Sequence, residues 1–344
     1  MIRNPTKLQY TKFIRLLNFV PRNTASILSL LVFVYIYTIY WKNNCNISRN
    51  SDCYTSPLTA SGTLNFSPSR LLDTIYGSSE PLKLKRITIA PSFWMVLGTD
   101  LLSKQINHGG DYPSDTMNTL RVLLPKISKQ HKSCVFFDVG CNIGALTLLA
   151  SSAGCNVHAF DVQDFAVALA QTSVYVNGFD AIVNLNAVSN VDGEKLPIFI
   201  RNSENLGMTT VVKDLDNLVG NAGTMVETIS LDRYSLLKNI KHINVLKIDV
   251  EGAEFDVIRG ATNLFDNYKV DIVSMELWHQ HAVETLEFFF SRNYKAYKIN
   301  KYPDVNNWHG SEISKSSIQE FMKSFNPPVA PNEDVIFVRP GYDI

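Results

Sequence analysis

Alternating strand and helix patterns run through the chain from about residue 81 onward. Short apolar runs predict strands, and apolar residues spaced three or four positions apart predict helices. The predicted strands are residues 134–140, 156–161, 181–189, 243–250, 270–277 and 333–340, and the predicted helices are 142–154, 164–178, 252–260 and 285–293. Because apolar strands joined by helices form parallel sheets covered on both faces, the pattern indicates an α/β fold with a doubly wound, mostly parallel sheet.

Three segments depart from this alternation. Residues 85–97 favour β structure, and residues 191–200 resemble the returning strand of a hairpin with its turn at Asp192-Gly193. We therefore expect extra antiparallel strands at the edge of the sheet. Residues 115–130 have helical spacing, which Pro125 is expected to interrupt because proline removes a backbone donor.

An uncharged apolar stretch lies between Arg22 and Lys42. As a helix it is long enough to cross the hydrocarbon layer of a membrane, which is about 30 Å thick. Tyr and Trp side chains gather at its carboxyl end, as at a membrane interface. One alternative is a cleaved signal peptide, which the long preceding region disfavours; the other is a buried core helix. Residues 24–41 are therefore predicted to form a transmembrane signal anchor.

The charges that flank this span predict its orientation. More Lys and Arg residues precede it than follow it, so the amino end is expected in the cytosol and the remainder in the lumen of the endoplasmic reticulum or Golgi. The segment after the span is rich in Ser, Thr and Asn and contains sequons at Asn46 and Asn65. The predicted order is that of a single-pass type II membrane protein: cytosolic tail (1–23), anchor (24–41), flexible stem (42–80) and one soluble domain (81–344).

Composition narrows the classes of function. The 344 residues include 32 Lys and Arg and 32 Asp and Glu, so the net charge is zero. Without a basic excess or a base-stacking motif, no nucleic-acid partner is predicted. None of the five cysteines has the C-x-x-C spacing of a zinc site. Cys134, Cys141 and Cys155 are expected to be packed thiols, and Cys45 and Cys53 could form a disulfide if their segment is extracytoplasmic.

Candidate chemistry gathers in the turn after the first parallel strand, DVGCNIG (138–144). Gly140 and Gly144 let the backbone turn sharply and approach a ligand, as both dinucleotide and S-adenosylmethionine (SAM) sites require. Asp138 distinguishes a SAM site from a dinucleotide site, because a carboxylate repels the diphosphate of a dinucleotide but accepts a hydrogen bond from the ammonium group of SAM. Asp161, which ends the second strand, suits ribose hydroxyls; alternatively it is the N-cap of the next helix.

Together these segments resemble the FkbM family of SAM-dependent methyltransferases. The matching segments are VFFDVGCNIGALTLLAS, HAFD, NLNAVSNVDG, ENLGMTT, ETISLDRY and INVLKIDVEGAEFDVIRGA, with the weaker INHGGDYPSDT upstream. They occur in the family's order over about residues 100–340. The resemblance implies a class I SAM-methyltransferase (Rossmann-like) fold, SAM as methyl donor, and O-methylation of a hydroxyl, often on a sugar or natural product.

By matching position, the resemblance assigns a set of residues to the cofactor: Asp138, Gly140, Asn142, Gly144 and Asp161. We add Asn186, which lies in the matching segment NLNAVSNVDG. The chain departs from the family pattern at Cys141, where a smaller residue is common, and at Asp161, which is shorter than the more usual Glu.

Three carboxylates lie in KIDVEGAE (247–254), where a predicted strand ends. Methyl transfer needs the acceptor oxygen aligned with the methyl carbon and a base for its proton. Strand alternation puts Asp249 at the carboxyl end, facing the cofactor side, so it is the first candidate for this base. Glu251 could share the role or bind sugar hydroxyls. The alternatives are structural: Lys247 neutralises a carboxylate, Glu251 lies near a helix cap, and Glu254 interacts with the helix dipole.

His279 and His281 lie in MELWHQH, which also follows a predicted strand. Either could be the base, since imidazole titrates near physiological pH; otherwise they are solvated loop residues. A metal held by His279, Asp249 and Glu251 would acidify the acceptor hydroxyl, but no ligand spacing supports it, so no metal site is predicted. The predicted catalytic set is Asp249, Glu251 and His279.

The combined expectation is a membrane-anchored O-methyltransferase that acts on a hydroxyl of a glycan, a glycoconjugate or another small acceptor. Two other classes stay open. One is a non-catalytic anchored receptor or trafficking factor with the same fold, which the intact DVGCNIG and KIDVEGAE motifs disfavour. The other is a nicotinamide oxidoreductase, which Asp138 disfavours.

Overall fold

The computed structural model describes residues 82–109, 114–131, 133–200, 209–211, 225–300, 310–326 and 331–343. All of them lie in one of the two compact units of the chain, Ser56–Ile344. The predicted tail, anchor (24–41) and stem fall outside these residues, so the anchor stays a prediction. Among the described helices, none combines the length and the apolar character that a membrane span requires.

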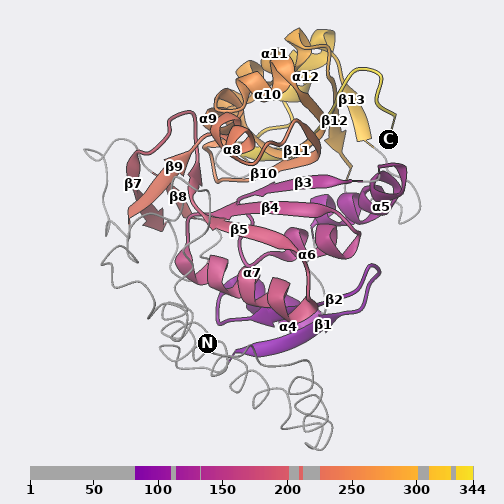
Figure 1. Cartoon of the computed structure of the whole chain (residues 1–344). Helices are drawn as coiled ribbons and strands as arrows, with labels where there is room; N and C mark the ends of the chain where they lie inside the picture. The colour runs from indigo at the N-terminus through magenta and orange to yellow at the C-terminus, as the bar shows by residue number, and fades with distance from the viewer. Residues whose placement is uncertain are drawn as a thin grey trace, which may run out of the picture. The chain divides into compact units, whose positions relative to one another are not determined.

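The central sheet has eight strands in the order β13-β12-β14-β11-β10-β3-β4-β5 (Figure 1). Their bounds are β3 Val135–Val139, β4 Asn156–Asp161, β5 Ala181–Leu185, β10 His242–Ile248, β11 Lys269–Trp278, β12 Lys295–Ile299, β13 Gly310–Ile313 and β14 Asn332–Val338. Neighbouring strands from β11 to β5 pair in parallel, whereas the pairs β11–β14, β14–β12 and β12–β13 are antiparallel. The predicted α/β fold with a mostly parallel sheet is therefore confirmed, and the order reverses between β3 and β10, where such sheets bind ligands.

Helices cover both faces of this sheet (Figure 1). On one face lie α4 Leu101–Gly109, α5 Asp115–Gln130, α6 Ala145–Ser152 and α7 Asp164–Asn177; on the other lie α8 Leu231–Leu237, α9 Glu254–Arg259, α10 Thr262–Asn267, α11 Ala282–Ser291 and α12 Ile318–Met322. Consecutive strand residues enter opposite cores: Phe136 packs into one and Phe137 into the other. Both faces are buried, which is why apolar residues predominate in the central strands.

Antiparallel strands do lie at the edge of the central sheet (β14, β12 and β13), but the predicted segment 85–97 is not among them. Strands β1 (Lys83–Ile87) and β2 (Phe93–Leu97) form a separate antiparallel pair. One face of the pair is apolar and buried, with Phe93 and Met95 in the same core as α6 and α7. The Val96 N–H donates to Ser173 Oγ of α7 at 2.8 Å, so the pair forms a further layer on the helices.

The predicted return strand 191–200 also pairs elsewhere than expected. A second sheet has the order β6-β9-β7-β8, with β6 Ala187–Val188, β7 Lys195–Ile200, β8 Thr209–Val211 and β9 Met225–Ile229. The turn before β7 is held by a later part of the chain, since Asp192 Oδ1 accepts from the Ser230 N–H at 2.7 Å and the Gly193 N–H donates to Thr228 O at 2.9 Å. These bonds direct β7 to β9 instead of back onto β5.

Pro125 does not interrupt its helix, which also corrects the prediction. Helix α5 runs continuously from Asp115 to Gln130 across the proline. Ser114 caps its amino end by accepting from the Met117 N–H at 2.9 Å, and its apolar face is buried, including Leu120, Leu123 and Leu124. Burying such side chains is worth about 1.5–3 kcal/mol each, which together exceeds the roughly 3 kcal/mol cost of an internal proline.

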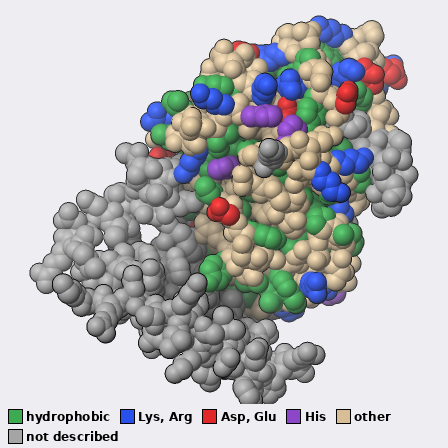
Figure 2. Space-filling view, turned by 45° about the vertical axis from the view of Figure 1, so that its right-hand side comes forward, with side chains coloured by type: hydrophobic (Ala, Val, Ile, Leu, Met, Phe, Trp, Pro, Cys, Tyr) green, Lys and Arg blue, Asp and Glu red, His purple; other side chains and the backbone are tan. Residues whose placement is uncertain are grey.

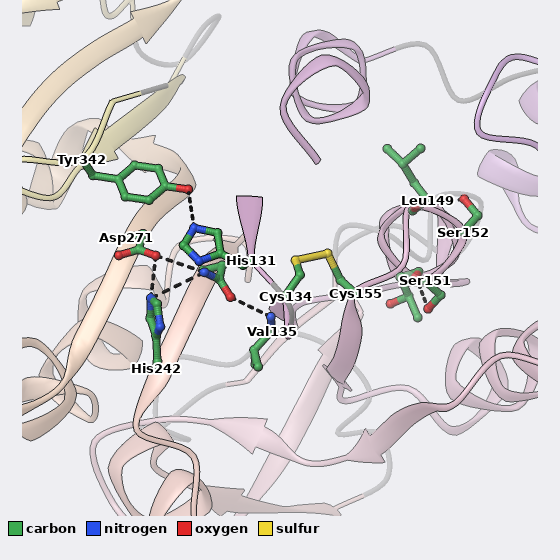
Figure 3. Close-up of a disulfide and its surroundings, with 12 residues drawn as sticks. His131, Cys134, Val135, Leu149, Ser151, Ser152, Cys155, His242, Asp271 and Tyr342 are labelled. Carbon is green, nitrogen blue, oxygen red and sulfur yellow. Dashed lines mark hydrogen bonds and ion pairs between the residues drawn. A yellow bond between two sulfur atoms is a disulfide. The ribbon is translucent and has the colours of Figure 1, made fainter. Parts of the chain in front are cut away.

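Two of the cysteines expected to be packed thiols form a disulfide. Cys134 and Cys155 precede the neighbouring strands β3 and β4, and they are joined 21 positions apart (Figure 3). Cys141 is the free buried cysteine among the described residues. Because the disulfide lies at the amino ends of the parallel strands, it is at the opposite end of the sheet from the turn after β3.

The face shown in Figure 2 carries its described Lys and Arg side chains in small separate groups, with acidic side chains among them. The described residues on this face do not form a continuous basic patch.

Candidate functional site

Most predicted site residues line one cavity at the carboxyl ends of β3, β4 and β10. The lining includes Asp138, Gly140, Asn142, Asp161, Asn186, Lys247, Asp249 and Glu251. Gly144 and His279 are the predicted site residues that are absent from this lining. The structure thus brings together groups that are up to about 110 positions apart in the sequence, at the point where the strand order reverses.

Gly140 fixes the turn after β3 against the turn after β10. It has φ +77°, and a Cβ at this position would lie 1.7 Å from the carbonyl oxygen of Asp249. The Asp249 N–H donates to Val139 O at 3.0 Å. The Gly140 N–H donates to Phe160 O of β4 at 2.9 Å. Only glycine fits here, and the three strand ends that carry the cavity are held together through it.

Gly144 does not line the cavity; it allows two helices to pack closely. It has φ +88°, and a Cβ there would lie 2.8 Å from the Cβ of Ala170. Its small size therefore lets the start of α6 approach α7. Its predicted role toward the cofactor is limited to shaping the turn.

Asp138 is fully buried, and protein groups compensate its charge. Its Oδ2 accepts from Thr147 Oγ1 at 2.7 Å, and its Oδ1 lies 3.5 Å from Lys247 Nζ. Lys247 also donates to two backbone carbonyl oxygens of the turn after β3 and lies 3.5 Å from Asp249 Oδ2. The structural interpretation of Lys247 is confirmed: one buried ammonium balances two carboxylates.

This arrangement leaves one oxygen of Asp138 for the contact with the cofactor's amino group, direct or through water, that the sequence predicted. Its Oδ1 makes no hydrogen bond among the described residues, so it is the one oxygen left for a cofactor ammonium or a water. The main effect of the carboxylate is to hold Lys247 and the turn in place. Thr147, which completes this contact, was missed in the sequence; it lies nine positions after Asp138 on the inner side of α6.

Asp161 shapes the turns around the cavity with both of its oxygens. Oδ2 accepts from the Asn142 N–H at 2.7 Å, and Oδ1 accepts from the Gln163 N–H at 3.0 Å. The N-cap of α7 is Gln163, so the alternative assignment of Asp161 as N-cap was wrong. Burial raises the pKa of Asp161, while these hydrogen bonds oppose the shift. Each oxygen has a second lone pair, which remains suited to ribose hydroxyls.

Asn142 and Asn186 complete the cofactor side of the cavity. Asn142 has φ +49°, and its side-chain oxygen accepts from the Ile143 N–H at 2.8 Å. Asn186 is 2% exposed; its Nδ2 donates to Glu227 O at 3.1 Å, and its Oδ1 has no hydrogen-bond partner among the described residues. An unsatisfied buried acceptor is costly. It therefore suits a ligand that brings an N–H donor, such as the amino group of adenine.

These features fit SAM. Asp161 can accept hydrogen bonds from the ribose hydroxyls, Asn186 can accept one from the adenine amino group, and Asp138 Oδ1 can accept one from the ammonium of the methionine part. The turn after β3 supplies a backbone that a ligand can approach closely. When bound, SAM supplies an electrophilic methyl group on a positively charged sulfur.

The predicted base lies in the same cavity. The Asp249 side chain is 40% exposed and is oriented by Lys247 at 3.5 Å. Glu251 follows at φ +58°, a left-handed conformation that is uncommon for a residue with a side chain. Both carboxylates border the space beside the cofactor residues, where they can accept hydrogen bonds from an acceptor hydroxyl.

Glu254 has the structural role considered for it. It is 3% exposed, and its Oε1 accepts from the N–H groups of Val250 and Gly252, both at 3.0 Å. Burial raises its pKa to about 7. It closes the turn that presents Asp249 and Glu251 and begins α9.

The histidines are not brought into the cavity. Both are exposed on η2 (His279–His281), where the His279 ring packs against Phe325 and the His281 ring stacks on Phe255. In the part of the chain that the structure describes, no three His, Cys, Asp or Glu side chains are arranged to hold a metal ion. The metal site considered for His279, Asp249 and Glu251 is therefore not assembled.

Glu276 was not considered in the sequence, although it lies in MELWHQH. It is on β11, next to β10, the strand that precedes Asp249, and its Oε2 accepts from Trp278 Nε1 at 2.9 Å. Burial, together with the charges of Asp249, Glu251, Glu254 and Asp334, raises its pKa to about 9. The sequence around Glu276 did not indicate this role, because the other carboxylates are distant in the sequence and come close to Glu276 only in the folded sheet.

Comparison with known proteins identifies the domain. Residues 138–296 match the family model of the methyltransferase FkbM domain. The match confirms the expected family, and with it SAM as the cofactor. No match was found among curated proteins.

Several solved structures are similar to this chain at low identity. They include a magnesium protoporphyrin IX methyltransferase from Synechocystis PCC 6803 with bound SAM (9% identity, 79% of this chain and 91% of that chain, TM-score 0.36). A precorrin-6y C5,15-methyltransferase from Geobacter metallireducens GS-15 has 8% identity, over 64% of this chain and 88% of that chain, with a TM-score of 0.31. A tRNA (uracil-54, C5)-methyltransferase from Pyrococcus abyssi, in complex with S-adenosyl-L-homocysteine, has 10% identity, over 76% of this chain and 44% of that chain, with a TM-score of 0.35.

Proposed function

We propose that this chain, whose residues 138–296 belong to the FkbM methyltransferase family, is a SAM-dependent O-methyltransferase acting on a hydroxyl of a glycan or glycoconjugate. One observation carries the proposal. The carboxylate of Asp249 lies in the cavity of the cofactor residues, partly exposed and oriented by Lys247. A hydroxyl acceptor needs such a base, because its proton must leave as the oxygen is methylated.

In this mechanism the protein positions and deprotonates the acceptor. Asp249 accepts the hydrogen bond of the acceptor hydroxyl and takes its proton. The new O–CH3 bond forms as the S–CH3 bond breaks, and S-adenosylhomocysteine leaves. Lys247 keeps the Asp249 side chain oriented before the proton arrives. Glu251 accepts from a second hydroxyl, and this favours acceptors that carry several hydroxyls, as sugars do.

We further propose that the domain acts in the lumen of the endoplasmic reticulum or Golgi. Two independent features support this placement. The sequence predicts a type II anchor at residues 24–41, and the domain contains the Cys134–Cys155 disulfide, a bond that persists in oxidising compartments. Glycosidase treatment of the expressed full chain tests it: a mobility shift that disappears in the Asn46→Gln, Asn65→Gln double variant supports the lumen, and no shift in the wild type opposes it.

The activity is tested with the purified full chain, SAM labelled in its methyl group, and a panel of methyl glycosides of common hexoses, deoxyhexoses and N-acetylhexosamines. Label on a sugar oxygen, located by mass spectrometry, is the expected result. Label only on nitrogen or carbon, or on no acceptor, would contradict the proposal.

A variant pair links the activity to the cavity. Asp249→Asn is expected to lower kcat by about 10²-fold or more, the usual contribution of a general base, with little change in S-adenosylhomocysteine affinity. Asp256→Asn is the matched control, because Asp256 lies in the following helix and is absent from the cavity lining. Equal activity of the two variants would remove Asp249 from the mechanism.

A further inference from the structure

A row of three carboxylates crosses the sheet beside the cavity. Lys247 of β10 lies opposite Ser274 of β11, and Glu276 of β11 lies opposite Asp334 of β14. Side chains two positions apart on a strand share a face. Glu276 and Asp334 therefore share one face, one step beyond Ser274. Neighbouring strands are about 4.8 Å apart, so these two carboxylates are next to each other. Asp249 follows the end of β10, and its carboxylate lies 3.5 Å from Lys247 and acts on Glu276.

Among the described residues, Lys247 lies 3.5 Å from the Asp249 end of the row and is shared with Asp138. Asp334 is hydrogen-bonded by the Thr116 side chain. Glu276 Oε2 accepts from the Trp278 indole N–H, which leaves Oε1 as the place for a proton. Carboxylates placed side by side do not all ionise at neutral pH; they share a proton.

The charged groups that face Glu276 decide which member of the row holds this proton. They are Asp249 and Glu251 in the turn after β10, Glu254 at the start of α9, and Asp334 on β14. Asp115 of α5 acts on Asp334. Burial and these neighbours raise the pKa of Glu276 to about 9 and that of Asp334 to about 6. We therefore expect the central carboxyl to hold the shared proton at neutral pH.

We propose that Glu276 is a positioning residue for methyl transfer: it stays a neutral carboxylic acid between Asp249 and Asp334 and, by donating a hydrogen bond to Asp249, holds that carboxylate toward the acceptor hydroxyl. The inference rests on the proposed function, since Asp249 is a base only if a hydroxyl is methylated. The acceptor proton passes to Asp249 as the O–CH3 bond forms and the S–CH3 bond breaks. Glu276 keeps its own proton throughout.

The protonation state is tested without any acceptor. Infrared difference spectra of the full chain, wild type minus Glu276→Gln, are recorded from pH 6 to pH 10 around the expected midpoint of about 9. The proposal predicts a protonated-carboxyl band at neutral pH that disappears around that midpoint. Asp334→Asn removes a neighbouring charge and should move the midpoint to lower pH. Glu333→Gln is the matched control, because Glu333 is on the same strand, faces the other side and pairs with Lys298 at 2.7 Å, so it should leave the midpoint in place.

The positioning role is tested with whichever glycoside of the panel is methylated. Glu276→Ala should lower kcat by about 10²-fold, as misplaced catalytic groups do, and Glu276→Gln should recover most of the loss. The wild-type kcat should fall as pH rises through about 9, and that of Glu276→Gln should not.

Three results would overturn the proposal: no band at pH 7, a midpoint unaffected by Asp334→Asn, or a folded, cofactor-binding Glu276→Gln as inactive as Glu276→Ala. If the wild type methylates no acceptor, it is the proposed function that fails. The infrared titration then still decides whether Glu276 holds the proton.

Discussion

Replacing Gly140 by alanine tests whether the turns after β3 and β10 meet as described. The substitution has two effects. It places a side chain at φ +77°, and it places a Cβ 1.7 Å from the carbonyl oxygen of Asp249. Gly193 separates these effects, since it has φ +74° but a Cβ added there would meet no atom within 4 Å. Gly193→Ala therefore measures the backbone strain, and the difference between the variants measures the clash.

The magnitudes follow from these contacts. An alanine in the left-handed conformation destabilises the folded state by about 1–2 kcal/mol. Alanine also reduces the conformational entropy of the unfolded chain, which stabilises the protein by about 0.4–1 kcal/mol. Gly193→Ala should therefore lower the free energy of unfolding by about 1 kcal/mol. Gly140→Ala must also push the two turns apart. It then weakens the Asp249 N–H to Val139 O bond, worth about 1 kcal/mol, and forces a repacking that costs about 1–3 kcal/mol. The expected total is about 3–5 kcal/mol.

Urea unfolding of both variants measures these free energies, and titration calorimetry with S-adenosylhomocysteine measures the effect on the cavity. Gly140→Ala should weaken the binding of this cofactor product by about tenfold or more, which corresponds to about 1.4 kcal/mol, because it displaces the turns that line the cavity. Gly193→Ala should leave this affinity unchanged. If Gly140→Ala destabilises the protein no more than Gly193→Ala, or binds S-adenosylhomocysteine normally, the two turns do not meet and this account of the site is wrong.

Three further predictions concern the cofactor, the disulfide and pH. Asp161→Asn should weaken S-adenosylhomocysteine binding about tenfold by calorimetry, because its amide group must face one of two backbone N–H donors; unchanged affinity would remove this residue from the site. The double variant Cys134→Ala, Cys155→Ala should lose about 2–4 kcal/mol in urea unfolding but bind S-adenosylhomocysteine normally, since the disulfide lies at the far end of the strands; a loss of binding would contradict that separation. The pKa of Glu276 is raised from 4.5 to about 9, so its stabilising proton is fully present below pH 4.5 and is lost as pH rises through 9. The unfolding free energy of the wild type should therefore fall over this range relative to Glu276→Gln, and parallel curves would refute the shift.

The sequence determined the elements and the residues at their ends. Strands such as β3 were recognisable because both of their faces are buried, so the residues before Asp138 are all apolar. Asp138, Asp161 and Asp249 stand where that apolar run stops, and carboxyl ends of parallel strands share one edge of a sheet. For this reason the cavity could be predicted from local pattern, before any pairing was known.

Tertiary structure decided which side chains are partners. The Cys134–Cys155 bond depends on the register between β3 and β4. The compensation of Asp138 by Lys247 depends on β10 lying beside β3.

The carboxylate row has the same origin. Glu276 meets Asp334 only because β14, the last strand of the described chain, enters the sheet antiparallel beside β11. The periodicity of a helix involves residues only three or four positions apart, so it can be read directly from the sequence. Which residues are neighbours across a sheet depends on the order and direction of the strands, and these depend on the free energy of the whole packed domain.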